Sequence, residues 1–242
     1  MKTASIIIIG NEILSGRTKD TNSNYLAKIL VEKGILLQEV RVIPDNHNII
    51  TSVVKRESSL KDYVFTSGGI GPTHDDITAE SIASCFDVPL IVRDDAVELL
   101  AMNYKNGKKD LNAARLRMAR IPKGAKLIKN KISGAPGFII KNVFVMAGVP
   151  QIFEAMVQVI SLDLEPIEPI LSKTIKIFKR ESEISERLWQ YADRYKDMSI
   201  GSYPFNNSGV FGVEIVLSHT DITVLNKIFD EILLDLNEPN TN

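Results

Sequence analysis

The stretch YVFTSGGIGPTHDDITAESIASCF, residues 63–86, decides the fold of the first part of the chain. It opens with β-branched and aromatic residues, which predict a strand at residues 63–65. A glycine-rich loop follows, and residues 77–86 then have the apolar period of a helix. Asp75, Asp76 and Thr78 crowd the start of that helix, where acidic and hydroxyl side chains are favoured. Strand, loop and helix in this order form the repeating unit of an α/β sheet.

The same alternation extends over about the first 160 residues. We expect further strands at residues 4–9, 37–43, 137–140 and 143–146, the last two joined by a two-residue turn at Lys141 and Asn142. Helices are expected at residues 21–33, 46–59, 96–104 and 111–119. This pattern predicts an α/β domain of three layers (αβα), with a mainly parallel sheet covered by helices on both faces.

A change in composition separates a second, smaller domain. The segment LEPIEP at residues 164–169 places two prolines and two glutamates between apolar stretches, which is typical of a linker. We therefore divide the chain into domains at residues 1–164 and 165–242. The second domain has the pattern of strands at residues 173–178, 198–203 and 212–218 and of helices at residues 182–195 and 222–236. It is expected to be a small α+β module.

Charge and composition narrow the class of protein. The 242 residues contain 29 basic and 30 acidic side chains, so no overall field would draw the chain to nucleic acid or to an anionic membrane. The apolar run at residues 4–9 is too short to span a bilayer. Cys85 is the single cysteine and cannot form an intramolecular disulfide, which fits a reducing compartment. We expect a cytoplasmic protein that binds neither nucleic acid nor membrane.

Polar residues follow each of the first three predicted strands. The first strand leads into Gly10 and Glu12, the second into Asp45, and the third into the loop at residues 67–76. Ligands of such sheets bind beyond the carboxyl ends of the strands, so these residues are expected to converge on one site. Glu12 could instead cap its loop, and an aspartate after proline, as at Asp45, is also a common turn residue.

The loop at residues 67–76 carries the strongest signal for a ligand. Glycines at three of four positions, Gly68, Gly69 and Gly71, can expose backbone N–H groups to a phosphate. Hydroxyl donors at the two flanks, Ser67 and Thr73, would add to this cradle. The alternative is an ordinary tight turn.

Two adjacent acids, Asp75 and Asp76, end this loop. They would repel a phosphate unless a cation lay between, and Mg²⁺ bound by carboxylates and ligand phosphates is a common solution. The plainer alternative is that they only cap the following helix. One turn apart on a later helix, Asn112 and Arg115 could face the same site, where the arginine would offer a fork for phosphate. An exposed helix surface is an equally good interpretation of that pair.

One short motif in the second domain could suggest RNA binding. Residues 209–212, GVFG, match the GxxG loop of RNA-binding KH domains. The middle residues are apolar, and residues 165–242 contain 8 basic and 13 acidic side chains. We therefore interpret this motif as the entry of a hairpin.

Several stretches resemble a known family when they are taken together. They are GNEILSGRTKDTNSNYLAKIL at residues 10–30, RVIPDN at 41–46, TSGGIGPTHDDITAESIA at 66–83, NAARLRMARIPKGA at 112–125 and MAGVP at 146–150. They resemble the N-terminal portion of the competence/damage-inducible protein A (CinA) family over about residues 4–160. Residues 173–236, including GSYPFNN at 201–207, resemble the KH-like domain that follows it in that family.

The resemblance implies a MogA/MoaB-like fold with a molybdopterin-binding-like first domain. Relatives of this kind hydrolyse ADP-ribose or other dinucleotide pyrophosphates with a divalent metal, and more distant ones adenylylate molybdopterin. The acidic positions that match those of the molybdopterin enzymes are Asp45 and Asp76. The loop after the first strand has Asn11 where many relatives have aspartate. Full-length bacterial relatives also carry a C-terminal deamidase domain, which residues 1–242 do not include, so deamidation is not expected.

The leading hypothesis is a metal-dependent pyrophosphatase acting on ADP-ribose or a related nucleoside diphosphate-linked substrate. Asp45 and Asp76 would be catalytic, and Asp45, Asp75 and Asp76 would hold Mg²⁺, with Mn²⁺ or Co²⁺ as alternatives. The rivals are a molybdopterin-binding protein of molybdenum cofactor synthesis and a non-catalytic nucleotide-binding protein. Edge strands that need cover make a homo-oligomer, in first place a dimer, the expected assembly.

Overall fold

The computed structural model describes residues 2–164, 169–207 and 209–237. Contacts within the chain divide it into two compact units, residues 1–167 and 168–242, and each is described by itself. The expected boundary after residue 164 and most of the expected linker, residues 165–168, lie outside the described residues.

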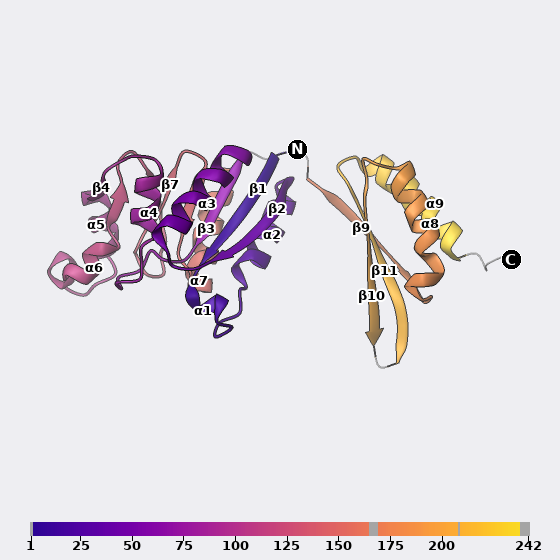
Figure 1. The fold of residues 1–242 in the computed structure, drawn as a ribbon, viewed down its shortest axis with the longest axis horizontal. Coiled ribbons are helices and arrows are strands. Elements are labelled where there is room, and N and C mark those ends of the chain that lie inside the picture. Colours follow the sequence, from indigo (N-terminus) through magenta and orange to yellow (C-terminus); the bar gives the residue numbers. More distant parts are fainter. Residues whose placement is uncertain (1, 165–168, 208, 238–242) are drawn as a thin grey trace. The chain divides into compact units, whose positions relative to one another are not determined.

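The first unit is built on a six-stranded sheet in the order β2-β1-β3-β8-β7-β6. Strands β1, β2, β3 and β7 of this sheet are labelled in Figure 1. Its strands are β1 (Lys2–Ile9), β2 (Ile35–Ile43), β3 (Tyr63–Ser67), β6 (Lys126–Ile128), β7 (Gly137–Ile140) and β8 (Val143–Met146). The pairs β1–β2, β1–β3 and β3–β8 are parallel, whereas β7 pairs antiparallel with β8 and with β6. The mainly parallel sheet is confirmed, and the expected turn between β7 and β8 has Lys141 at a φ of 51°.

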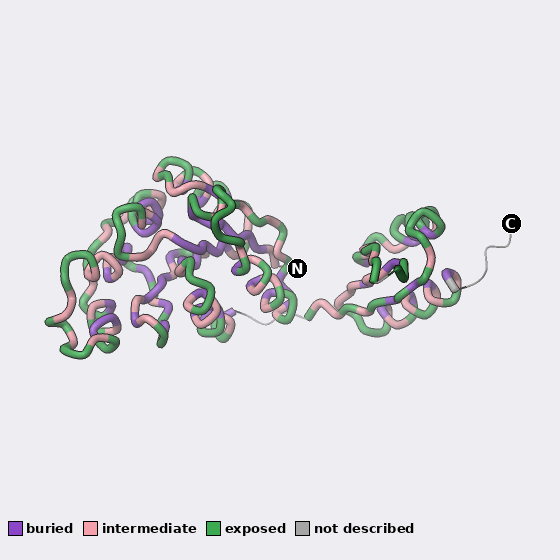
Figure 2. The backbone as a smooth tube through the Cα atoms, turned by 90° about the horizontal axis from the view of Figure 1, so that it is seen from below, coloured by how far each residue is buried: buried purple, intermediate pink, exposed green. Residues whose placement is uncertain are grey.

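Helices cover both faces of this sheet. One face packs against α3 (His47–Leu60) and α4 (Thr78–Cys85), and the other against α2 (Asn22–Glu32) and α7 (Pro150–Ser161). Residues 4–9 of β1 are all buried, because a central parallel strand is covered on both sides. Figure 2 shows buried segments inside the unit and exposed positions on its outer surface. The three-layer prediction is therefore confirmed.

Several elements, most of them short, were not predicted. They are α1 (Asn11–Leu14), β4 (Leu90–Val92), β5 (Arg120–Pro122), a 3-10 turn (Gly107–Asp110), and the strand β6 and helix α7 given above. β4 and β5 form a separate antiparallel pair. The helix expected at residues 96–104 is α5 (Asp94–Ala101), and the one expected at 111–119 is only α6 (Ala113–Arg117), because the chain soon enters β5.

The second unit is a three-stranded antiparallel sheet in the order β10-β11-β9, with two helices. Its elements are β9 (Leu171–Ile177), α8 (Glu181–Arg194), β10 (Ser199–Asn207), β11 (Val210–His219) and α9 (Ile222–Asn237). Apolar side chains of the sheet, of α8 and of α9 form one core. Gly209, at a φ of 90°, precedes β11 in the hairpin, so the interpretation of GVFG as a hairpin entry and the α+β class are both confirmed.

No helix in the described ranges has the length and apolar character that crossing a membrane would require.

Candidate functional site

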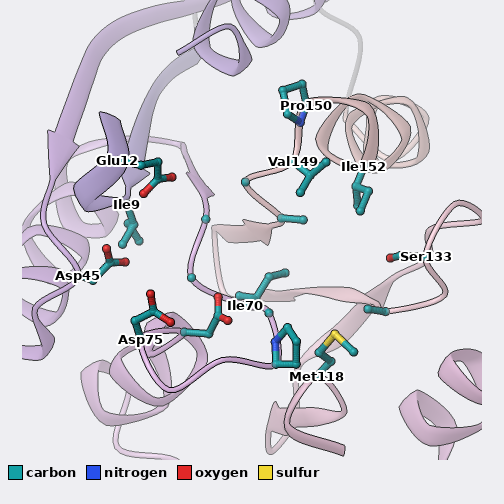
Figure 3. Close-up of a pocket in the computed structure, with 18 of the residues that line it drawn as sticks. Ile9, Glu12, Asp45, Ile70, Asp75, Met118, Ser133, Val149, Pro150 and Ile152 are labelled. Carbon is teal, nitrogen blue, oxygen red and sulfur yellow. The ribbon is translucent and has the colours of Figure 1, made fainter. Parts of the chain in front are cut away.

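A cavity of about 520 Å³ lies at the carboxyl ends of β1, β2, β3 and β8 (Figure 3). It is lined by acidic residues, by the glycine-rich loop after β3, by the start of α7, and by residues from the segments around α6 and before β7. The lining residues are Ile9, Glu12, Thr18, Asp45, Gly68, Gly69, Ile70, Gly71, Pro72, Asp75, Asp76, Met118, Ser133, Ala135, Ala147, Gly148, Val149, Pro150 and Ile152. The structure therefore shows the predicted convergence of the ends of β1, β2 and β3 on one cavity.

The glycine loop is packed so tightly that part of its composition is structural. Gly68 has a φ of 109°, and a Cβ there would lie 2.1 Å from the carbonyl oxygen of Ile9. Its N–H donates to the carbonyl oxygen of Met146 at 3.1 Å, so this amide is already used. Of the predicted phosphate cradle, Gly68 thus supplies a lining surface but no free donor.

Three further amides of the loop have no partner in the described part of this unit, whereas the N–H groups of Thr73 and Asp76 are used within the loop. Within residues 2–164, no group accepts a hydrogen bond from the backbone N–H of Gly69, Ile70 or Gly71. The start of α7 is similar: it has Pro150 in its first turn and no side-chain cap, and the N–H groups of Gln151 and Ile152 likewise have no acceptor in that range. Unpaired amides at a helix N-terminus and in a loop are the groups that bind anions in proteins.

Three acidic side chains line the cavity on the side away from Val149, Pro150 and Ile152 at the start of α7 (Figure 3). They are Glu12, from α1, Asp45, after β2, and Asp75, from the glycine-rich loop. Burial raises the pKa of Asp45; the N–H of Asn11, 2.9 Å from its Oδ2, opposes this, and the charges of Glu12 and Asp75 raise the pKa further. No Lys or Arg in the described ranges lies within 4.0 Å of these three carboxylates. His74 Nδ1 lies 3.9 Å from Asp75 Oδ1, so the three acids have one histidine near them but no Lys or Arg partner in the described ranges.

Thr73 and Asp76 hold the loop together. The Thr73 N–H donates to Asp76 Oδ2 at 2.8 Å, and the Thr73 hydroxyl lies 2.5 Å from both Asp76 Oδ2 and Asp75 Oδ1. The hydroxyl contact lowers the pKa of Asp75. Thr73 does not line the cavity, so the prediction that it donates to a phosphate is wrong for this arrangement: its donors are engaged by the two acids. Asp76 does line the cavity, with one carboxylate oxygen committed to the loop.

The acids fit a cation that a ligand helps to bind. Over the described ranges, no group of three or more His, Cys, Asp or Glu side chains could hold a metal ion by itself. Carboxylate oxygens are nevertheless the donors that a hard divalent cation prefers, and Mg²⁺ commonly keeps several waters and takes further ligands from substrate phosphates. Glu12, Asp45 and Asp75 could thus supply some of the ligands of such a cation, and water and the phosphates of a substrate would supply the others.

Ser67 is also placed differently from the prediction. It is buried and does not line the large cavity; its hydroxyl lies 2.8 Å from Asn22 Nδ2 and 3.4 Å from the carbonyl oxygen of Ala147. Asn22 Nδ2 also donates to the carbonyl oxygen of Gly148 at 2.8 Å. This amide therefore ties the end of β3 to the loop after β8. Asn22 is not among the predicted site residues, although a polar residue that shares the buried face of α2 with Leu26 was a usable signal.

Asn112 and Arg115 are not brought to the cavity. The Asn112 side chain caps α6 by accepting the Arg115 N–H at 2.9 Å. The guanidinium group of Arg115 lies 4.3 Å from the centre of the Tyr104 ring and donates to the carbonyl oxygen of Asp110 at 2.5 Å. Both side chains therefore have structural partners, which corrects their assignment to the phosphate site.

Gly10 supports the site without lining it. Its N–H donates to the carbonyl oxygen of Ile43 at 3.2 Å, which joins the ends of β1 and β2. The Glu12 carboxylate folds back over it, and a Cβ on Gly10 would lie 2.5 Å from Glu12 Oε1. Gly10 thus leaves space for Glu12 and does not contact the cavity as predicted.

The rest of the cavity wall is apolar. Ile70, Met118, Val149 and Ile152 surround it away from the acids, with Ser133 as a polar side chain among them (Figure 3). A ligand that fits both walls would combine an anionic group with an uncharged, largely apolar part.

Comparison with known proteins gives matches over both units. Residues 5–168 match the family described as “Probable molybdopterin binding domain”. Residues 169–241 match “FAD synthase, middle domain”, which takes the place of the KH-like domain expected from the sequence. A protein of Archaeoglobus fulgidus is 37% identical over 199 residues, which are 82% of this chain and 84% of that protein.

Two further relatives carry informative names. A Caenorhabditis briggsae protein named “Probable FAD synthase” is 32% identical over 240 residues, covering 89% of this chain. The chain spans less than half of that relative, 46% of its length. The crystal structure of the protein CinA from Thermoplasma acidophilum is 35% identical, covers 67% of this chain and 98% of the CinA chain, and superposes with a TM-score of 0.63. The chain therefore belongs to the family of probable molybdopterin-binding domains, with the MogA/MoaB-like α/β fold in its first unit.

Proposed function

We propose that the cavity binds a nucleoside diphosphate-linked substrate of the ADP-ribose type and hydrolyses its pyrophosphate with the help of a divalent cation. The observation that carries the proposal is one cavity, in the described part of the first unit, that is lined both by unpaired amides and by three carboxylates without a Lys or Arg partner. Amides alone would suit any anion. Because the neighbouring acids would repel that anion, the combination favours a ligand that arrives with a cation, as nucleoside diphosphates do with Mg²⁺.

Each wall has a role in this proposal. The N–H groups of Gly69, Ile70 and Gly71 bind phosphate oxygens, and the N-terminus of α7 adds its positive dipole. Asp45 and Asp75, with Glu12 beside them, hold the cation, for which Mg²⁺ is the first choice and Mn²⁺ or Co²⁺ the alternatives. The cation would offset the charge of the diphosphate. The apolar wall packs against the nucleoside.

The reaction needs one water molecule and one proton acceptor. The water oxygen attacks one phosphorus, the bond from that phosphorus to the bridging oxygen breaks, and the departing phosphate keeps the electron pair. Asp45 takes the proton of the water, because its carboxylate lines the cavity on the side where the cation would orient that water. ADP-ribose would give AMP and ribose 5-phosphate. Asp76, the second acid expected to be catalytic and to bind metal, acts in this proposal mainly by fixing the loop through Thr73.

A second candidate is binding of molybdopterin, favoured by the family match of residues 5–168. The pterin's phosphate would use the same amides, and its ring would lie on the apolar wall. This candidate differs from the first in requiring no hydrolysis of a diphosphate.

The test is product formation by the purified chain. ADP-ribose, FAD, NAD and molybdopterin are each supplied with Mg²⁺, Mn²⁺ or Co²⁺, and products are separated chromatographically. We expect AMP from ADP-ribose, and a loss of rate of about 100-fold or more in Asp45→Asn. Asp94→Asn is the matched control, because Asp94 is exposed at the start of α5 and does not line the cavity.

The other outcomes separate the rivals. Tight binding of molybdopterin with no product from any diphosphate would support the second candidate. Tight binding of ADP-ribose with no turnover under any of the three metals would indicate a non-catalytic nucleotide-binding protein. Either result would contradict the proposed hydrolysis.

A further inference from the structure

Two arginines lie against the glycine loop at a place that the proposed function does not use. Arg117 ends α6 and Arg120 begins β5. Both line a small cavity of about 10 Å³ that adjoins the large one and shares Gly69, Ile70, Gly71, Asp76 and Met118 with it. The same loop thus faces the large cavity on one side and two guanidinium groups on another.

These guanidinium groups have almost no partners. Arg117 Nη2 donates to the carbonyl oxygen of Asp76 at 3.4 Å, and the buried Nε atoms of Arg117 and Arg120 have no acceptor. In the described ranges, no carboxylate lies within 4.0 Å of either side chain. Two other arginines of the same unit have carboxylate partners: Arg41 pairs with Glu39 and Glu57, although its Nε also makes no hydrogen bond, and Arg93 pairs with Asp95.

An unpaired, partly buried cation is costly, and two of them beside each other also repel. Such an arrangement is balanced when an anion binds nearby. Asp76 lines the same small cavity, but its side chain is directed to Thr73, and it meets Arg117 only through its backbone carbonyl. The missing negative charge is therefore expected to come from outside the chain.

We infer that Arg117 and Arg120 form a positively charged platform behind the loop Gly69–Gly71 that positions the diphosphate of the ligand. This inference rests on the proposed function, in which the loop amides bind phosphate. A space of about 10 Å³ holds no more than about one water molecule, so the phosphates lie in the large cavity and the arginines act across the loop. The two side chains are positioning residues and do not take part in the bond-breaking step.

The arginine that the sequence suggested for the phosphate site differs from those of the platform. Arg115, which the sequence suggested, is stacked on Tyr104 and bonded to Asp110. Arg117 lies two positions further along the same short helix and lines the small cavity below the loop. The pair Arg115 and Arg117 therefore offers a matched control within one helix.

The experiment measures the binding of inorganic pyrophosphate, without metal and with a chelator present, by the rise in unfolding temperature as its concentration increases. For wild type and Arg115→Gln we expect the same apparent Kd. Arg117→Gln and Arg120→Gln should each weaken binding by about fivefold to tenfold, the effect of one charge acting over a short distance at the protein surface. Arg117→Lys should recover most of the affinity, and both glutamine variants should show a smaller salt dependence than wild type.

The unfolding temperature without pyrophosphate shows whether the arginine variants disturb the packing of the protein and not only the binding of the anion. Because the arginines repel each other and lack anions, Arg117→Gln and Arg120→Gln should leave this temperature unchanged or raise it. A fall of this temperature in both glutamine variants, with the same fall in Arg117→Lys, would show that the side chains serve packing and would overturn the inference. The inference would also be overturned if pyrophosphate raised the unfolding temperature equally in wild type and all four variants, or in none of the five proteins.

ADP-ribose hydrolysis by the same proteins separates this inference from the proposed function. If wild type binds pyrophosphate through the arginines but releases no AMP, the platform stands and the hydrolase proposal fails. If AMP is released equally well by wild type and by Arg117→Gln, and their pyrophosphate affinities agree, the hydrolase stands and the platform fails.

Discussion

Replacing Gly69 by alanine tests how the glycine loop is held in place. A Cβ at Gly69 would lie 2.1 Å from Thr78 Oγ1 and 3.1 Å from Thr78 Cβ, well inside the 3.4–4 Å of ordinary contact. Thr78 cannot withdraw easily, because it is fully buried and its N–H donates to the carbonyl oxygen of Gly69 at 2.9 Å. The loop is therefore expected to move away from α4.

The magnitude follows from two contributions. A non-glycine residue at a φ of 69° costs about 1–2 kcal/mol. Relieving the overlap with Thr78 costs about another 1–3 kcal/mol, as in other overpacked sites. The free energy of unfolding should therefore fall by about 2–5 kcal/mol. Affinity for ADP-ribose should fall by about tenfold, since the N–H groups of the loop are displaced from the bound phosphate.

Urea unfolding and calorimetric titration with ADP-ribose are the assays, and the chain offers a matched control. Gly16 has a φ of 72°, but a Cβ there would meet nothing within 4 Å. Gly16→Ala should therefore show only the backbone contribution of about 1–2 kcal/mol. Adding Thr78→Ala to Gly69→Ala should restore about 1–2 kcal/mol by making space. An equal loss of stability in Gly69→Ala and Gly16→Ala would refute the reasoning.

The remaining predictions concern stability and assembly. The pKa of Asp62 is lowered by hydrogen bonds from the N–H and hydroxyl of Thr3. The ionised Asp62 carboxylate therefore stabilises the folded protein at pH values above the ordinary pKa of aspartate. This stabilisation is lost as the pH falls through the lower pKa of the folded state. Asp62→Asn should therefore lower the unfolding free energy at pH 7 and flatten its decline in acid, as followed by urea unfolding at stepped pH. Asn22→Ala should destabilise the protein by about 1–3 kcal/mol, because it leaves buried partners unpaired, whereas the exposed Asn24→Ala should change stability by about 0.5 kcal/mol or less, measured by thermal unfolding. We expect a homodimer in sedimentation equilibrium, because β2 is an edge strand of the six-stranded sheet and edge strands need cover; a monomer at all accessible concentrations would contradict this.

Strands and helices with a long apolar pattern could be predicted from the sequence. β1 and the β7–β8 hairpin were predictable because buried runs and a two-residue turn are local signals. β4, β5 and β6 have three residues each, too few for any period to show. The start of α7 follows β8 after a short connection, and its apolar sequence did not reveal where the helix begins.

The site was predictable where it depends on strand ends, and not where it depends on side-chain direction. Glu12, Asp45 and Asp75 line the cavity because each follows a strand of the same sheet. Ser67 and Thr73 have the right chemistry, but neighbouring Asn22 and the two acids engage their hydroxyl groups. Whether a helical arginine faces a site depends on a rotation of about 100° per residue, which a single sequence does not fix when the helix has only five residues.

The most direct measurement is the affinity for ADP-ribose with and without Mg²⁺, by calorimetric titration of wild type and of the double variant Asp45→Asn/Asp75→Asn. In wild type, Mg²⁺ should tighten binding by about tenfold or more. In the double variant this coupling should vanish, while binding in the presence of a chelator should equal or exceed that of wild type, because two repelling charges are gone. Equal affinity with and without Mg²⁺ in wild type, or a double variant that binds more weakly in chelator, would contradict a cation held between these acids and the phosphates.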